Sequence, residues 1–272
     1  SVRAYERVAT RDDEELILMD WPRQPDGPPV LDGKPYPKVA HLAENAYPFV
    51  AISRYLREIN LAAPEVLQVD YEQGIVLLEN LGIGGVLDDE GRPIDQRYRE
   101  AVVCLGYLHS HPMRQNLAID DNHVHHIPDF DPTAMKMEAR LLLDWHLPWK
   151  RGSQPTDEER QSYLRIWDAL IAELAGAERN LLLRDFHSPN IIWRSQESGV
   201  RRIGIIDFQD AMIGPTAYDL ASLVQDARVD IPPRLADQMM RDYVALRRAL
   251  GAFDEPAFLK AFAIMSAQRN CK

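Results

Sequence analysis

Three oxygen-bearing side chains, Asp185, Asn190 and Asp207, stand beside short apolar runs in the second half of the sequence. The runs 181–183 and 203–206 are typical of strands that end at the two carboxylates, and Asn190 opens another apolar segment. Neighbouring strand ends would bring the three side chains into one cleft. Carboxylate and amide oxygens suit Mg²⁺, and phosphoryl transfer needs such a metal together with a base for the attacking hydroxyl. Asp-x₄-Asn followed by Asp-Phe therefore predicts metal-dependent phosphoryl transfer.

The sequence around these residues resembles the aminoglycoside phosphotransferase and choline kinase family, which has a protein-kinase-like fold. In that family the catalytic loop is roughly H-x-D-x-x-x-x-N, and the metal-binding segment is I-D-F-x-D-A-x-x-G-P-x-x-x-D-L-A. Residues 206–221 match the second motif nearly in full. The resemblance implies an ATP- and Mg²⁺-dependent kinase in which Asp185 is the catalytic base. It also implies that Asn190 and Asp207 bind the metal.

Other residues of the two motifs receive roles through the same resemblance. Asp210 would line the substrate side of the cleft, whereas Asp219 would hold the loops in place through backbone N–H groups. His187 lies inside the catalytic loop, where it either contacts the substrate or is incidental. Leu183 stands where the family often has a histidine. Because that histidine chiefly supports the loop, its loss need not abolish the chemistry.

The nucleotide side departs further from the family pattern. The lysine that contacts the ATP phosphates aligns with Met19, and its glutamate partner aligns with Phe49. Loss of both members leaves neither charge unpaired, so another cation must neutralise the phosphates. Arg3 is the candidate, because Ser1 to Tyr5 resembles the S-x-R-x-Y end of a phosphate-covering loop. The glycine-containing start of that loop would precede this chain, and the natural protein is expected to extend beyond both ends.

Adenine recognition is expected at Glu79-Asn80-Leu81, which would form the hinge whose backbone binds the base. The glycine-rich stretch 82–85 then breaks the strand pattern. We therefore expect a nucleotide-binding lobe over residues 1–82 and a catalytic and acceptor-binding lobe over residues 83–272.

Three sequence features resemble one branch of the family, the anomeric sugar kinases of bacterial cell-wall recycling. They are Met-Asp-x-Pro at 19–22, Asp-Phe-Gln-Asp-Ala at 207–211 and the catalytic loop without histidine. That branch phosphorylates the C1 hydroxyl of N-acetylmuramate or N-acetylglucosamine, so the resemblance implies an amino-sugar acceptor. Trp145 would then stack on a sugar ring, unless it packs with Trp149 inside the helical lobe. Glu138 either binds an acceptor hydroxyl or remains solvated.

Two other functions remain open. A kinase of an aminoglycoside, an amino alcohol or a homoserine-like compound fits the same motifs, and a dense acidic cleft would favour the polycationic aminoglycosides. A nucleotide-binding pseudokinase that serves as a regulatory module is the third hypothesis. Met19 and Phe49 favour it, whereas the intact set of Asp185, Asn190 and Asp207 opposes it.

The elements that would position these residues follow from hydrophobic periodicity. In the first part the pattern predicts a hairpin, a Pro- and Gly-rich loop, a helix and a strand, at residues 2–19, 22–37, 41–60 and 74–81. Helices follow at 94–110, at 133–145 and after a capping box at Thr156. Three short strands are expected at 180–184, 191–193 and 202–206, with helices from residue 215 onward. This order predicts an α+β fold with a small strand-rich lobe and a larger, mainly helical lobe.

Composition limits the class of partner. The 272 residues carry a net charge of −11, which argues against broad binding to nucleic acids or anionic membranes. Cys104 and Cys271 are far apart and suggest neither a disulfide framework nor a zinc site. The sequence shows no apolar run of about 18 residues and no signal peptide. We therefore expect a cytoplasmic protein with a small-molecule acceptor, and the sequence leaves the oligomeric state open.

Overall fold

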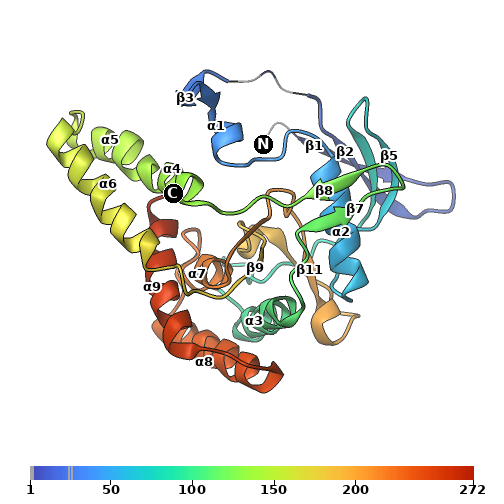
Figure 1. The fold of residues 1–272 in the computed structure, drawn as a ribbon. Coiled ribbons are helices and arrows are strands. Elements are labelled where there is room, and N and C mark those ends of the chain that lie inside the picture. The colour runs from blue at the N-terminus through green and yellow to red at the C-terminus, as the bar shows by residue number, and fades with distance from the viewer. Residues whose placement is uncertain (1–2, 24, 26) are drawn as a thin grey trace.

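The computed structural model describes residues 3–23, 25 and 27–272. They form two lobes, of which one carries an antiparallel sheet and the other is mainly helical (Figure 1). This arrangement confirms the predicted α+β, two-lobed fold. In the described part of the chain, none of the helices combines the length and the apolar character needed to cross a membrane.

The sheet of the N-terminal lobe has the strand order β1-β2-β6-β5, and each neighbouring pair is antiparallel. Its strands are β1 (Ala4–Ala9), β2 (Glu15–Asp20), β5 (Val66–Asp70) and β6 (Ile75–Glu79). The hairpin of the first two strands and the strand within 74–81 were predicted, whereas β5 was not. Gly74 makes the turn between β5 and β6 possible. It has a φ of +75°, and a Cβ there would lie 2.1 Å from the backbone oxygen of Trp21.

The helix of this lobe, α2 (Tyr47–Glu58), begins later than predicted. His41 has a φ of 53°, and the side-chain oxygen of Asn45 accepts a hydrogen bond from the Tyr47 N–H at 3.1 Å. Both features oppose helix before Tyr47. The segment ahead of it was predicted as plain loop, but it contains three short elements: β3 (Pro29–Leu31), β4 (Lys34–Pro35) and α1 (Tyr36–Val39).

The helical lobe begins with α3 (Asp95–Ser110), which confirms the helix predicted at 94–110. The capping box at Thr156 is confirmed as well, because its hydroxyl and the Glu159 carboxylate exchange hydrogen bonds with each other's backbone N–H groups. The helix predicted at 133–145 is longer than expected and contains a π-helical turn, η1. The remaining helical elements are α4 (Pro132–Leu141), η1 (Leu142–His146), α5 (Leu147–Arg151), α6 (Asp157–Ala172), α7 (Ala217–Val224), α8 (Pro233–Leu250) and α9 (Glu255–Asn270).

Short antiparallel pairs lie between the lobes. The pair β9 (Arg179–Leu182) and β12 (Met212–Pro215) and the pair β10 (Ile191–Trp193) and β11 (Ile203–Ile205) frame the predicted catalytic residues. The single turns η2 (Ser188–Asn190) and η3 (Gly199–Arg202) precede β10 and β11. A further hairpin, β7 (Asn116–Ala118) and β8 (Val124–His126), lies beside α2 (Figure 1). Of these strands, β9, β10 and β11 were predicted.

One hydrophobic core extends through both lobes, from Met19 in β2 to Met265 in α9. Backbone hydrogen bonds also join them: Ile205 N–H donates to the Ala62 carbonyl at 2.7 Å. Just beyond the predicted boundary, Trp193 N–H donates to the Gly84 carbonyl, also at 2.7 Å. The lobes are therefore held together tightly around the junction, and the boundary at residue 82 remains a prediction.

Candidate active site

The catalytic loop follows β9, and a side chain of α7 holds its backbone in place. The buried carboxylate of Asp219 accepts hydrogen bonds from the backbone N–H groups of Leu183, at 2.6 Å, and Arg184, at 2.9 Å. This confirms the structural role expected for Asp219. Arg184 has a φ of 70°, a conformation that non-glycine residues adopt only where surrounding contacts impose it. The loop is therefore held in one shape, with Asp185 at a defined position.

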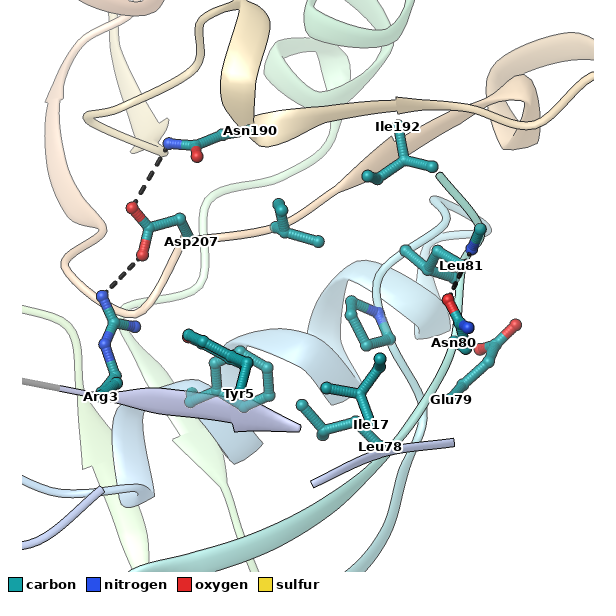
Figure 2. Close-up of a pocket in the computed structure, with 14 residues that line it drawn as sticks. Arg3, Tyr5, Ile17, Leu78, Glu79, Asn80, Leu81, Asn190, Ile192 and Asp207 are labelled. Carbon is teal, nitrogen blue, oxygen red and sulfur yellow. Dashed lines mark hydrogen bonds and ion pairs between the residues drawn. The ribbon is translucent and has the colours of Figure 1, made fainter. Parts of the chain in front are cut away.

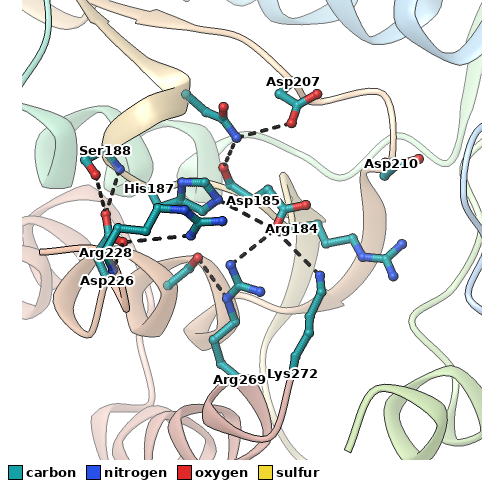
Figure 3. A network of polar contacts seen from close by, with 12 residues as sticks. Arg184, Asp185, His187, Ser188, Asp207, Asp210, Asp226, Arg228, Arg269 and Lys272 are labelled. Carbon is teal, nitrogen blue, oxygen red and sulfur yellow. Dashed lines mark hydrogen bonds and ion pairs between the residues drawn. The ribbon is translucent and has the colours of Figure 1, made fainter. Parts of the chain in front are cut away.

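Asp185 faces positively charged side chains of the last helix and the residues after it (Figure 3). Its Oδ1 lies 3.1 Å from Nη2 of Arg269 and 3.6 Å from Nζ of Lys272. Burial raises the pKa of Asp185, but the charges of Lys272, Arg269 and Arg184 outweigh burial and lower the pKa below its ordinary value. The group is therefore a carboxylate at neutral pH, the form that can orient or accept the proton of a hydroxyl.

Asn190 and Asp207, the predicted metal ligands, are neighbours. Asn190 Nδ2 donates to the backbone carbonyl of Asp185 at 2.9 Å and to Asp207 Oδ2 at 3.4 Å. No group of three or more His, Cys, Asp or Glu side chains among the described residues could hold a metal by itself. One carboxylate and one amide oxygen nevertheless fit Mg²⁺, which takes its other ligands from water and substrate phosphates. The donor set is thus compatible with a metal that arrives together with a nucleotide.

A first cavity, of about 380 Å³, opens between the sheet of the N-terminal lobe and this pair of residues (Figure 2). Its middle is apolar, with Tyr5, Ile17 and Leu78 among the lining side chains, and Asn190 and Asp207 lie at one end. The opposite end carries the predicted hinge, 79–81, together with Gly82. The Leu81 N–H and carbonyl take part in no hydrogen bond within the described residues, so both can pair with a ligand edge. The cavity matches a planar base at one end and phosphates at the other.

Arg3 lines the first cavity at the end that carries Asp207, and its contact with phosphates stays a prediction. Its Nη2 is 2.6 Å from Asp207 Oδ1, and its guanidinium lies over the ring of Trp21 at 4.9 Å from the centroid. The side chain is only 10% exposed, so its position is well defined by its surroundings. Ser1 was also predicted to contact the nucleotide, but it lies outside the described residues.

The positions of the missing lysine and glutamate are filled by apolar packing. Met19 was predicted to lie at the nucleotide, but it is fully buried and does not line the first cavity. The ring of Phe49 stacks on Phe208 with centroids 4.9 Å apart and an interplanar angle of 21°. Phe208 directly follows Asp207, the predicted metal ligand. An aromatic contact therefore connects this segment to α2 at the position where the family pattern has the glutamate of the ion pair.

Two acidic residues expected on the acceptor side have structural partners instead. Asp210 Oδ1 accepts the backbone N–H of Ala43 at 2.6 Å, which ties the segment before α2 to the catalytic region. Glu138 is fully buried and lies 2.5 Å from Arg184 Nη2, so the expectation that it remains solvated is wrong. Its other oxygen accepts hydrogen bonds from Tyr218 and Gln268. With these partners Glu138 supports the loop rather than presenting an oxygen to an acceptor.

The tryptophans of the long helix are exposed. Trp145 is 73% exposed and Trp149 is 77% exposed, so the expectation that they pack inside the helical lobe is wrong. Stacking of Trp145 on a sugar stays a prediction. The π-helical turn that carries Trp145 is a type of irregularity often found at functional sites.

A second cavity, of about 760 Å³, lies on the other side of the catalytic loop. His187 lines this cavity. The predicted catalytic residue Asp185 and the predicted metal ligands Asn190 and Asp207 line it as well. Burial and then the charge of Arg228 lower the pKa of His187, which keeps the imidazole neutral near pH 7. The remaining side chains come from the ends of α7 and α9 and the connection after α7: Ser222, Gln225, Asp226, Arg228, Arg269, Asn270 and Lys272.

The two-lobed fold and the two cavities that share Asn190 and Asp207 are those expected of an enzyme that transfers a phosphoryl group between two bound ligands. Residues 1–255 match the phosphotransferase enzyme family, and the chain belongs to that family. The structure is similar to an amicoumacin kinase in complex with AMP-PNP, Ca²⁺ and Ami, with a TM-score of 0.63 and 13% identity, over 100% of this chain and 76% of that one. A choline/ethanolamine kinase family protein from Mesorhizobium loti gives a TM-score of 0.58 and 16% identity, over 98% and 76% of the two chains.

Curated relatives with similar sequences are N-acetylmuramate/N-acetylglucosamine kinases. The Caulobacter vibrioides protein is 29% identical, over 98% of this chain and 75% of the relative. Those of Neisseria meningitidis and Pseudomonas putida are each 28% identical, over 99% and 84% of this chain and 73% and 64% of the relatives. These comparisons confirm the predicted family and the protein-kinase-like fold, and the protein is an ATP-dependent phosphotransferase that acts on a small molecule.

Proposed function

We propose that the protein transfers the γ-phosphate of Mg²⁺-ATP to the anomeric hydroxyl of an N-acetylated amino sugar. The observation that carries this proposal is that Asn190 and Asp207 line both cavities, with Asp185 beside them on the second. A nucleotide in the first cavity and an acceptor in the second would therefore meet at the catalytic loop. The amino-sugar acceptor is supported by the names of the relatives, whose similarity extends over nearly the whole chain.

In this proposal each residue has a separate task. Asn190 and Asp207 would hold Mg²⁺, which would neutralise phosphate charge. Asp185 orients the acceptor hydroxyl and takes its proton as the O–P bond forms and the bond to the β-phosphate oxygen breaks. Arg3 leaves Asp207 and pairs with the phosphates, and Leu81 binds the base through its backbone. We place this reaction in the cytoplasm, where ATP is available.

The second cavity does not favour a polycationic acceptor. Three cationic side chains, Arg228, Arg269 and Lys272, line it and would repel the ammonium groups of an aminoglycoside. These lining residues do not form the dense acidic cleft that would have favoured the aminoglycoside alternative.

The test is an acceptor panel with Mg²⁺-ATP, followed by ³¹P NMR. N-acetylmuramate, N-acetylglucosamine, kanamycin, choline and homoserine would be compared, and we expect a sugar 1-phosphate from an amino sugar. Phosphate on kanamycin or choline alone would overturn the acceptor class while leaving the family intact. No product with any acceptor, despite nucleotide binding, would favour the pseudokinase hypothesis.

Asp185→Asn is the matched variant for the mechanism. Removal of the base should lower kcat by about 100-fold or more, because general-base catalysis typically contributes about 10²–10⁴-fold. The dissociation constant of Mg²⁺-ATP should stay nearly unchanged, since Asp185 does not line the first cavity. Lost nucleotide binding with unchanged turnover would contradict the assignment of Asp185 as the base.

A further inference from the structure

The second cavity has an uneven distribution of charge. Its acidic side chains lie at the catalytic loop and at Asp226. Arg269 and Lys272 approach Asp185 from the last helix and the residues after it, whereas Arg228 lies beside Asp226 and His187 (Figure 3). Such a group of cations beside a catalytic carboxylate is unexpected in a chain with a net charge of −11. The question is which of them are already engaged and which can contact an acceptor.

Arg269 and Lys272 are committed to protein partners. Arg269 contacts Asp185 at 3.1 Å, donates from Nε to Ser222 Oγ at 3.1 Å and lies over the ring of Tyr218. Lys272 Nζ lies 3.4 Å from Glu138 and 3.6 Å from Asp185. These contacts assign both cations to holding the catalytic carboxylate.

Arg228 differs from the other two. Its side chain is 55% exposed, and its nearest carboxylate oxygen, Asp226 Oδ1, lies 4.0 Å away. Asp226 is buried and already accepts hydrogen bonds from Ser188 N–H and Oγ, at 2.9 and 2.6 Å, and from the Arg228 N–H, at 3.0 Å. The Asp226 carboxylate thus secures the backbone of the loop, and the Arg228 guanidinium keeps its hydrogen-bonding capacity for a ligand.

The position of Arg228 is also suitable for contacting and recognising an acceptor. Figure 3 shows its guanidinium beside His187, on the same side of the catalytic loop as the Asp185 carboxylate. A group held there would touch an acceptor whose hydroxyl faces Asp185. Guanidinium groups pair with carboxylates through two parallel hydrogen bonds, which gives both affinity and orientation.

We propose that Arg228 binds a carboxylate on the acceptor and thereby makes the site select a carboxylated amino sugar over its neutral counterpart. N-acetylmuramate carries such a carboxylate on its lactyl ether, whereas N-acetylglucosamine has none. This proposal rests on the proposed amino-sugar kinase activity and adds to it the residue that distinguishes the two sugars.

The experiment compares kcat/KM for the two sugars in the wild type, Arg228→Gln, Arg228→Lys and a control, Arg234→Gln. Arg234 is 90% exposed on α8 and does not line the second cavity. In Arg228→Gln we expect about a 10-fold loss with N-acetylmuramate, the size of one charge-assisted hydrogen bond, and a change within about 2-fold with N-acetylglucosamine. Arg228→Lys should retain part of the preference, and Arg234→Gln all of it.

Equal losses with both sugars, or no loss with either, would overturn the role of Arg228. Titration calorimetry of both sugars on the wild type and Arg228→Gln separates this result from failure of the proposed function. If the wild type turns over neither sugar, the kinase proposal is wrong. The titration still shows whether Arg228 binds the carboxylate of N-acetylmuramate. A preference for N-acetylmuramate that disappears in Arg228→Gln supports the proposal, and equal or undetectable binding of the two sugars overturns it.

Discussion

Arg3 connects the first cavity to Asp207, the proposed metal ligand. Its guanidinium pairs with Asp207 Oδ1 in the structure. In the proposed complex the phosphates would offer Arg3 a more highly charged partner and would leave Asp207 available to the metal. The same residue can therefore neutralise a carboxylate in the free protein and a phosphate in the complex.

Replacement of Arg3 tests this role. In Arg3→Gln we expect the KM for ATP to rise about 10-fold, because one charge-assisted hydrogen bond to the phosphates is lost. Arg3→Lys should recover part of the effect, and Arg7→Gln, an exposed change on the strand that follows Arg3, should have none. Steady-state kinetics at saturating acceptor measures all three. An unchanged KM in Arg3→Gln would show that another group binds the phosphates.

At the residue scale, motif spacing predicts part of the site. Asp185 and Asn190 belong to one loop, and the short antiparallel strands β10 and β11 return the chain from Asn190 to Asp207. The three side chains are therefore close in space. Arg228 and Arg269 could not be predicted in this way. Arg269 is 84 residues from Asp185 in sequence, and only the packing of α9 against α7 brings the two together.

At the scale of elements, α2 and the metal-binding segment are joined by aromatic stacking. Phe49 is buried and contacts Phe208, the residue after Asp207. Phe49 stands where the family pattern has the glutamate of an ion pair, and its packing stabilises without the desolvation cost of buried charges. The position of Asp207, the proposed metal ligand, thus depends on how well α2 packs.

Phe49→Ala should lower the free energy of unfolding by about 3–5 kcal/mol, because a buried aromatic ring is lost and a cavity remains. Leu259→Ala removes a partly exposed side chain on α9 and should change it by about 0.5 kcal/mol or less. Urea denaturation of both variants measures the difference. Similar small changes in the two variants would contradict the importance of the Phe49–Phe208 contact.

Long elements with clear periodicity or caps, such as α3 and α6, were predictable from sequence. The strands β7, β8 and β12 were missed, because they are only three or four residues long. The hairpin of β7 and β8 packs beside α2, and β12 pairs with β9, from which β10 and β11 separate it in sequence. Residues 41–46 were predicted as helix since they continue the pattern of α2, but the hydrogen bond from Tyr47 to Asn45 fixes a turn there. Local sequence does not contain these tertiary contacts.

At the scale of the whole molecule, Arg184 links three segments. Its Nη1 donates to the Ala40 carbonyl in the N-terminal lobe at 2.8 Å, its Nη2 pairs with Glu138 on α4, and its backbone belongs to the catalytic loop. The guanidinium is almost completely buried. Substitutions in the Arg184–Glu138 ion pair should therefore lower the stability of the whole folded structure.

Glu138→Gln should lower the free energy of unfolding by about 3–5 kcal/mol, the cost of leaving a buried charge without its partner. Glu173→Gln, in an exposed ion pair with Lys260, should have a much smaller effect, because solvent screens exposed pairs. Burial raises the pKa of Glu138, but Lys272 and Arg184 outweigh it and hold the pKa below its ordinary value. Its stabilisation is therefore present above the pKa of the unfolded chain and is lost as pH falls through the folded pKa.

Urea denaturation at several pH values checks this expectation. The gap between the wild type and Glu138→Gln should be full near pH 7 and should shrink in acid. A gap that is constant down to the acid transition, or equal to that of Glu173→Gln, would contradict a buried and ionised Glu138.

The contact between Arg3 and the ring of Trp21 has an optical consequence. Trp21 is buried, and the guanidinium lies 4.9 Å from its ring centroid. A positive charge so close to an indole interacts with its π electrons, and its departure toward phosphate changes the electric field at the ring. In the proposed complex Trp21 emission should therefore change when a nucleotide binds, so its fluorescence can report on that binding.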